Sequence, residues 1–156
     1  MSTSRKAIAA ALLRQLTAGG QFTNSGRRDR APEQAAAPGK PGLYIVKGRE
    51  RYLYAGGEYE RGAPPVRELA FLAVIYTDVG ADETAVPADT IDDLLDAIDG
   101  ALAPAAIDQL SNGGRQTLGG LVYDCRIDGE VELAPGDVQG KGSTIVPIKI
   151  TLDQYP

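Results

Sequence analysis

The feature that most constrains how this chain can fold is a regular alternation of apolar and polar residues over positions 121–133. The apolar parity, broken only by Gly129, holds Leu121, Tyr123, Cys125, Ile127, Val131 and Leu133. The opposite parity is mostly polar and holds Asp124, Arg126, Asp128, Glu130 and Glu132. A period of two predicts a β-strand with one buried and one solvent-exposed face. Because Gly119-Gly120 precedes this segment and a mostly apolar stretch over 143–152 follows it, we expect a glycine hinge and then a long C-terminal strand pair.

Several further segments are expected to be strands. Residues 69–77 are apolar on both parities, which predicts the centre of a sheet. Residues 43–47 and 51–55 flank Gly48-Arg49-Glu50 and predict a hairpin, and residues 21–24 predict a short strand. Pro147 has no backbone N–H to donate, so we expect the last strand to be an edge or to bulge there.

Two segments have the spacing of amphipathic helices. The first covers about residues 4–16, with Ser2, Thr3 or Ser4 as its cap and Gly19-Gly20 as its stop. The second is capped by Asp89 or Thr90. Its apolar stripe holds Ile91, Leu94, Leu95, Ile98 and Leu102.

The glycine- and proline-rich segments at about 31–42 and 56–65 are expected to be flexible loops. With 156 residues, 43% of them hydrophobic, the chain has the size of one ordinary domain. We therefore expect a single α+β domain over 1–156, built on a mostly antiparallel or mixed β-sheet. We interpret the basic and then apolar N-terminus as an amphipathic helix instead of a signal peptide, and we expect no membrane span.

The composition excludes several kinds of catalytic site. The chain has no histidine and one cysteine, Cys125, which rules out Ser-His-Asp and Cys-His catalysis, histidine-ligated metals, an internal disulfide and a thiolate zinc site. Cys125 lies on the apolar parity, so we interpret it as a core residue. Residues 136–143 lack the spacing of a phosphate loop and lie between two expected strands, which favours a hairpin loop. We expect no cofactor.

One acidic motif keeps an enzymatic alternative open. Asp92, Asp93 and Asp96 have the D-D-x-x-D spacing that holds magnesium diphosphate in isoprenoid synthases, because carboxylates one helical turn apart can converge on a hard cation. Acidic residues are also favoured at a helix N-terminus, and Leu94 and Leu95 belong to the apolar stripe. We therefore interpret the aspartates as a solvated helix face. A small magnesium-dependent enzyme that uses the Asp92–Asp96 carboxylates is the alternative.

Charge is distributed unevenly along the chain. Residues 1–30 carry six basic groups and one acidic group, residues 31–68 carry six and five, and residues 69–156 carry four and fifteen. These sums are +5, +1 and −11, which together give the formal net charge of −5. Such a split suits a protein that meets different partners, or its own neighbours, through opposite ends. Acidic helices and loops that are merely solvated are the simpler explanation.

Six residues are candidates for interaction with a partner. The one compact basic cluster holds Arg27, Arg28 and Arg30. It suits either nucleic-acid phosphate or an acidic patch on a neighbouring subunit, although no aromatic platform flanks it. Near a glycine-rich loop lie three tyrosines that are either interface anchors or ordinary strand residues, namely Tyr52, Tyr54 and Tyr59.

The order of these elements resembles that of the tail-terminator (tail-completion) proteins of long-tailed bacteriophages, similar to the lambda minor tail protein U type. The matching pieces are the helix of Arg5-Lys6-Ala7-Ile8, the segment near Arg27-Arg28, the strand over 72–76 and the helix over 90–98. Most specific is Gln116-Thr117-Leu118-Gly119-Gly120-Leu121-Val122-Tyr123, followed by Ile145-Val146-Pro147-Ile148. The resemblance covers the C-terminal part of the chain well and the rest loosely, and it departs at 31–42 and 56–65.

The resemblance implies a sheet covered on one face by two main helices. It also implies a structural virion protein and no enzyme. A ring of six copies would cap the head-proximal end of the tail tube, stop tube polymerisation and join the head-completion or connector proteins. DNA would pass through the bore without sequence-specific binding. The expected location is the tail or neck of the virion, and the host cytoplasm during assembly. Another phage neck or tail-tube-like ring protein is the close alternative.

Overall fold

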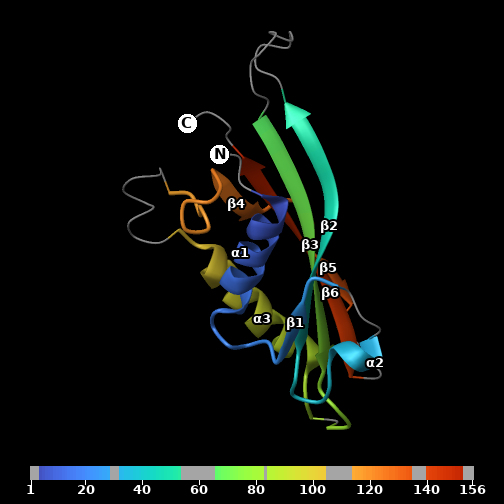
Figure 1. The fold of residues 1–156 in the computed structure, drawn as a ribbon. Helices are drawn as coiled ribbons and strands as arrows, with labels where there is room; N and C mark the ends of the chain where they lie inside the picture. The colour runs from blue at the N-terminus through green and yellow to red at the C-terminus, as the bar shows by residue number, and fades with distance from the viewer. Residues whose placement is uncertain are drawn as a thin grey trace, which may run out of the picture.

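The computed structural model describes residues 4–28, 32–53, 66–82, 84–104, 114–134 and 140–152, and within them one curled mixed sheet carries two main helices on one face (Figure 1). The elements in chain order are α1 (Arg5–Thr17), β1 (Asn24–Gly26), α2 (Pro32–Ala35), β2 (Gly42–Leu53), β3 (Val66–Asp78), α3 (Pro87–Leu102), β4 (Asp124–Ile127), β5 (Glu132–Ala134) and β6 (Lys141–Leu152). The predicted α+β class is confirmed.

Strand β3 lies at the centre of the sheet. The strand order is β1-β2-β3-β6-β4, with β5 alongside β6. Strand β3 pairs antiparallel with both β2 and β6, whereas β1 runs parallel to β2. The prediction that residues 69–77 form the sheet centre is therefore confirmed. Strand β3 carries apolar side chains on both faces, because the main core covers one face and a smaller cluster covers part of the other.

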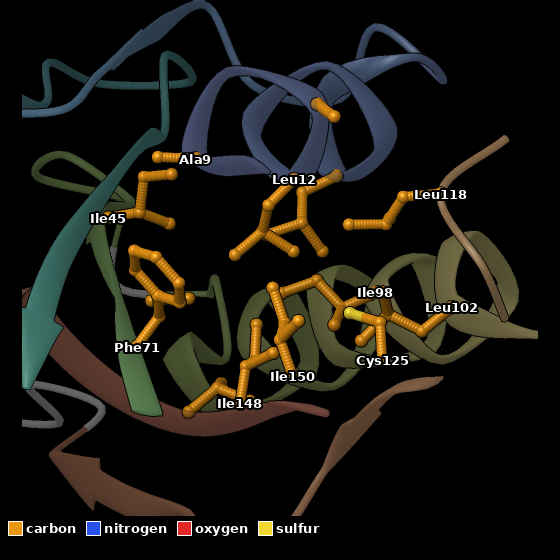
Figure 2. Close-up of a cluster of buried hydrophobic side chains, with 14 of the residues drawn as sticks. Ala9, Leu12, Ile45, Phe71, Ile98, Leu102, Leu118, Cys125, Ile148 and Ile150 are labelled. Carbon is orange, nitrogen blue, oxygen red and sulfur yellow. The ribbon is translucent and has the colours of Figure 1, made fainter. Parts of the chain in front are cut away.

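The main core lies between the two long helices and one face of the sheet. Figure 2 shows Leu12 of α1, Ile98 of α3 and Phe71 of β3 pointing into the space between these elements. Alternate residues of β6 complete the core from below, because a strand presents every second side chain to the same face. The core residues of β6 are Val146, Ile148, Ile150 and Leu152.

A second, smaller cluster covers part of the opposite face. Tyr44 of β2 and Tyr76 of β3 lie with their ring centroids 6.1 Å apart, and Val74 and Ala35 pack with them. Helix α2 sits directly against β2: the carbonyl oxygen of Ala35 leaves no room for a Cβ at Gly42. The segment expected to be a loop over 31–42 therefore contains this short helix, whose packing onto Tyr44 overrides the helix-breaking composition around it.

The helix starts were predicted with different success. Ser4 caps α1, as expected, and its Oγ accepts a hydrogen bond from the backbone N–H of Ala7 at 3.1 Å. The cap predicted for α3 at Asp89 or Thr90 is wrong, because α3 begins at Pro87 with Val86 in the cap position and no side-chain cap. Proline is favoured at a first helical position, because a backbone N–H there has no hydrogen-bond partner within the helix. The apolar stripe of α3 is confirmed, with Leu95 only partly buried.

The hairpin predicted around Gly48-Arg49-Glu50 is wrong, because β2 is one continuous strand. A β-bulge between Lys47 and Glu50 takes up the extra residues. A Cβ at Gly48 would lie 3.1 Å from the carbonyl oxygen of Ala70 on β3, so the bulge brings the two backbones close together. Strand β3 continues far enough to pair with β2 on both sides of the bulge, and this long partner keeps β2 in the sheet through a turn-like sequence.

The C-terminal strand pair forms, but its first member is interrupted. Strands β4 and β5 both pair antiparallel with β6, and residues 128–131 between them leave the ladder. Pro147 of β6 lies opposite this break, where it accepts a hydrogen bond from Asp128 N–H at 3.1 Å and donates none. Gly129, with φ +125°, lies against the proline ring. The irregularity predicted for the last strand at Pro147 is therefore found in the neighbouring strand segment, residues 128–131 between β4 and β5.

The alternation over 121–133 predicted burial correctly at four of its six apolar positions. Cys125 is buried, and Leu121, Ile127 and Val131 are partly buried against the core, but Tyr123 and Leu133 are 43% and 57% exposed. Val122, on the polar parity, is buried because it lies in the turn before β4. Neither α1 nor α3, nor any other helix among the described residues, is long and apolar enough to cross a membrane.

Two substitutions on adjacent residues of β3 test this arrangement. Phe71→Ala should lower the free energy of unfolding by about 3–5 kcal/mol, because it leaves a cavity in the main core. Leu72 lies on the opposite face and is 37% exposed, so Leu72→Ala should change the free energy of unfolding by less than about 1 kcal/mol. Urea unfolding followed by circular dichroism measures both. Equal losses for the two variants would contradict the assignment of the faces.

Candidate functional site

The turn over 116–122 carries the most specific part of the sequence resemblance, and it folds as a packed joint. Leu118, Gly119 and Gly120 have φ values of +50°, +75° and +86°, so three successive residues are left-handed. The carbonyl oxygen of Thr117 accepts hydrogen bonds from the N–H groups of Gly120 and Val122, both at 3.1 Å. Glycine removes the steric penalty of this backbone at two of the three positions.

The side chain of Gln116 ties this joint to the end of α3. Its Nε2 donates to the carbonyl oxygen of Ala103 at 2.9 Å, and its Oε1 accepts from the N–H of Leu118 at 3.0 Å. Gln116, Thr117 and Leu118 are all buried. Because the amide satisfies backbone groups on both sides, this glutamine fixes where the chain leaves the helix layer and enters β4.

Tyr52, one of the predicted interaction residues, belongs to a charged cluster within the chain. Arg5 at the start of α1 donates from Nε and Nη2 to the two carboxylate oxygens of Glu50, at 2.6 and 3.0 Å. Arg5 Nη2 also donates to the Tyr52 hydroxyl at 3.0 Å, and Lys47 forms an ion pair with Glu50. The cluster fastens the first turn of α1 to β2, while the Tyr52 residue stays 47% exposed.

The hydrogen bonds from Arg5, together with Lys47, lower the pKa of Glu50 to about 2. The same contact raises the pKa of Arg5, chiefly through its hydrogen bond to Glu50. Sequence reasoning missed this cluster because Arg5 and Glu50 are far apart in the chain. The only signal was a lone acidic residue among the basic residues of the predicted hairpin.

The basic cluster is described only in part. Arg27 and Arg28 follow directly on β1 and are exposed, and neither has an ion-pair partner among the described residues. Arg30, Tyr54 and Tyr59 lie outside the described residues. Strand β1 pairs with the first residues of β2, Gly42–Tyr44, whereas Tyr52 lies near the other end of β2. The structure therefore does not bring Arg27 and Tyr52 together.

The aspartates of the D-D-x-x-D motif lie on the outside of α3. Asp92, Asp93 and Asp96 are exposed, while Leu94 between them points into the core. Within the described ranges, no three acidic, cysteine or histidine side chains are placed to hold a metal ion together. This placement agrees with the interpretation of the aspartates as a solvated helix face.

The predicted core position of Cys125 is confirmed. The residue is 1% exposed, and burial, with a smaller effect of the nearby Asp124 carboxylate, raises the pKa of its thiol to about 12. The thiolate is the reactive form of cysteine, so this environment suppresses nucleophilic chemistry. The segment predicted as a hairpin loop over 136–143 joins the antiparallel strands β5 and β6, but its last three residues, 141–143, already belong to β6. Residues 135–139 lie outside the described residues.

The two lateral sides of the sheet differ in charge. The side of β1 and β2, taken as residues 24–28 and 42–53, carries five basic residues and one acidic residue. The other side, taken as α3 and residues 124–134, carries nine acidic residues and one basic residue. Because β1 and β4 are the opposite ends of the strand order, the charge split along the chain becomes a split across the molecule.

No protein-family model matches the chain, and no curated protein sequence matches it significantly.

Acid titration tests the Glu50 cluster. Glu50→Gln should lower the free energy of unfolding at pH 7 by up to about 1 kcal/mol, because the contact lies at the surface. The pKa of Glu50 is lowered by folding, so the charged contact stabilises above the ordinary carboxyl pKa and is lost as the pH falls towards 2. The difference between parent and variant should therefore disappear between about pH 4 and pH 2.

Urea unfolding at pH 7, 4 and 2 provides the measurement, with Glu132→Gln as the control. Glu132 is exposed and has no ion pair with any residue in the described parts of the chain. A difference between parent and Glu50→Gln that persists unchanged at pH 2 would rule out the ionic explanation.

Thiol labelling tests the burial of Cys125. A thiolate-directed reagent at pH 8 should leave the folded protein unmodified and label it rapidly in denaturant, because the buried thiol with a raised pKa stays protonated. Cys125→Ser combined with Ala134→Cys provides the control, since Ala134 is exposed on β5 and should be labelled at once. Fast labelling of the folded parent would contradict the buried position.

Proposed function

We propose that this protein is a structural subunit that caps the head-proximal end of a phage tail tube as a ring of six copies. In this role it stops tube polymerisation and forms the joint to the head-completion or connector proteins. The observation that carries the proposal is the element order, in which a helix, a sheet, a second helix, a glycine turn and a closing strand pair follow one another as the resemblance implies. Both main helices lie on one face of the sheet (Figure 1).

The use of the most specific segment supports a structural role. The side chain of Gln116 forms its hydrogen bonds with backbone groups of the turn before β4 and of the end of α3, and left-handed residues shape this turn. A segment whose polar groups bind the protein's own backbone fits a structural role. The alternative phage neck and tube-like ring proteins also need a rigid fold. What distinguishes the proposed cap from them is the tube, and the end of that tube, to which the protein binds.

Charge supports the passage of DNA without retention. The described surface of α3 is acidic along its exposed face, with Asp92, Asp93 and Asp96 among its residues. Each cation placed on phosphate would add salt-sensitive affinity, whereas carboxylates near a bore repel the backbone. An acidic protein, with a formal net charge of −5, therefore suits a conduit.

Tube capping tests the proposal directly. The purified protein, added to polymerising tail-tube protein of the same phage, should arrest tube growth and appear at one tube end as a ring in negative-stain images. Native mass measurement without added metal should give six copies for the assembled ring, alone or released from tube ends. Unchanged tube lengths together with a monomeric protein under every condition would refute it.

The enzymatic alternative has a different signature. It requires saturable magnesium binding, detected by calorimetry and lost in Asp92→Asn/Asp93→Asn/Asp96→Asn. That result, with no effect of the protein on tube length, would replace the structural proposal by the enzymatic one.

A further inference from the structure

We propose that copies of this chain meet side to side, with the basic side of one copy against the acidic side of the next. The basic side consists of β1 with Arg27 and Arg28, together with β2. The acidic side consists of β5 and the outward face of α3. This inference rests on the proposed function only in taking the partner to be a second copy, and its support is the position of the charges.

The basic side has charges without partners. Four exposed arginines form no ion pair with the residues that the structure describes, namely Arg27, Arg28, Arg49 and Arg51. The one acidic residue of β2, Glu50, is already bound by Arg5 and Lys47. The net positive charge of this side is therefore available to a neighbouring molecule.

The acidic side has the complementary property. Asp124 is paired with Arg126 at 3.7 Å and Asp128 with Lys149 at 3.2 Å, both within the chain. Glu130 and Glu132, farther along this side, are exposed and unpaired in the described ranges. The uncompensated charge therefore concentrates next to β5.

Two aspartates of α3 face this side of the molecule. Helix α1 contacts β1, β2 and α3, while α3 contacts β3 and β6, so α1 lies over the basic side. Gln15 of α1 donates to the carbonyl oxygen of Ala101 at 2.7 Å, at the end of α3. Asp92 and Asp99 lie three residues before and four residues after Leu95, and helical spacing puts all three on the side of α3 opposite Ala97 and Ala101.

Each side also exposes one large side chain suited to an interface. Tyr52 on β2 is 47% exposed and Leu133 on β5 is 57% exposed. The bulge and the arginines of β2, and the three-residue length of β5, oppose pairing of the sheet edges themselves. The contact is therefore made by side chains. Leu133 lies at the level of β1, and Tyr52 lies at the far end of β2, so the two are apolar residues at different heights of the contact.

Charge-swapped variants test the contact. Arg27→Glu/Arg28→Glu/Arg49→Glu gives a copy with two acidic sides. Asp92→Lys/Asp96→Lys/Asp99→Lys/Glu130→Lys/Glu132→Lys takes the acidic side from −8 to +2 and gives a copy with two basic sides. Each variant alone should self-associate at least about tenfold more weakly than the parent at low salt, because equal charges now meet. An equimolar mixture should recover association, since alternating copies are complementary, and high salt should weaken it.

Mass photometry and sedimentation velocity measure association, and circular dichroism verifies folding. The matched control is Arg14→Glu/Lys40→Glu/Lys141→Glu, which makes the same change of net charge as the arginine variant at exposed positions outside both sides. This control should associate like the parent. If it loses association as the swapped variant does, net charge explains the effect and the side contact is overturned.

Two other outcomes also decide the matter. A mixture that stays monomeric at low salt overturns the side contact. Variants that each assemble like the parent also overturn it, although the proposed ring of six copies then still stands. If the mixture recovers association while tubes grow unchecked in the presence of the parent, the side contact stands and the proposed function falls.

Discussion

Burial of both faces of β3 over residues 73–77 is the constraint on which the rest of the structure depends. One face carries Leu69, Phe71 and Ile75 into the main core, and the other carries Val74 and Tyr76 into the smaller cluster. A strand covered on both faces must also satisfy its backbone on both edges, since water does not reach it. Strands β2 and β6 therefore extend along almost the whole of β3.

The length of β3 in turn decides the form of its neighbours. Strand β2 tolerates Gly48-Arg49 as a bulge because the ladder with β3 resumes at Glu50. Strand β6 tolerates Pro147 because its ladder with β3 is intact there, and only the outer neighbour breaks at 128–131. In both cases a local preference against strand structure is offset by a long and continuous pairing on the other side.

The sequence predicted what periodicity controls. The stripe of α3, the cap of α1, the central position of β3 and the closing strand pair all follow from the spacing of apolar residues or from one capping side chain. It did not predict features that depend on partners distant in the chain. The turn composition at Gly48 favoured a hairpin, and only the reach of β3 decides otherwise.

The candidate site shows the same division. The sequence identified Arg27 and Arg28 as an exposed basic pair and Tyr52 as an exposed aromatic residue, and burial agrees with both. It did not identify the bond from Arg5 to Glu50, because ion pairs across the fold have no signature in local spacing. The sequence also showed that the two ends of the chain differ in charge. Which surfaces carry these charges depends on the sheet edges that the two ends of the chain occupy.

The strand order converts that split into a directional surface. The N-terminal segments form one lateral edge and the acidic C-terminal segments β4 and β5 form the other, because β6 returns beside β3 and carries them outward. Contacts between unlike sides repeat in one direction and close into a ring only when the rotation between neighbours permits it. Charge would thus choose which sides meet and how quickly, whereas the packing of side chains at the contact would set the angle between copies. The number of copies in a closed assembly is accordingly a property of that packing and of the curl of the sheet, since charges attract over a range of angles while packed side chains fix one.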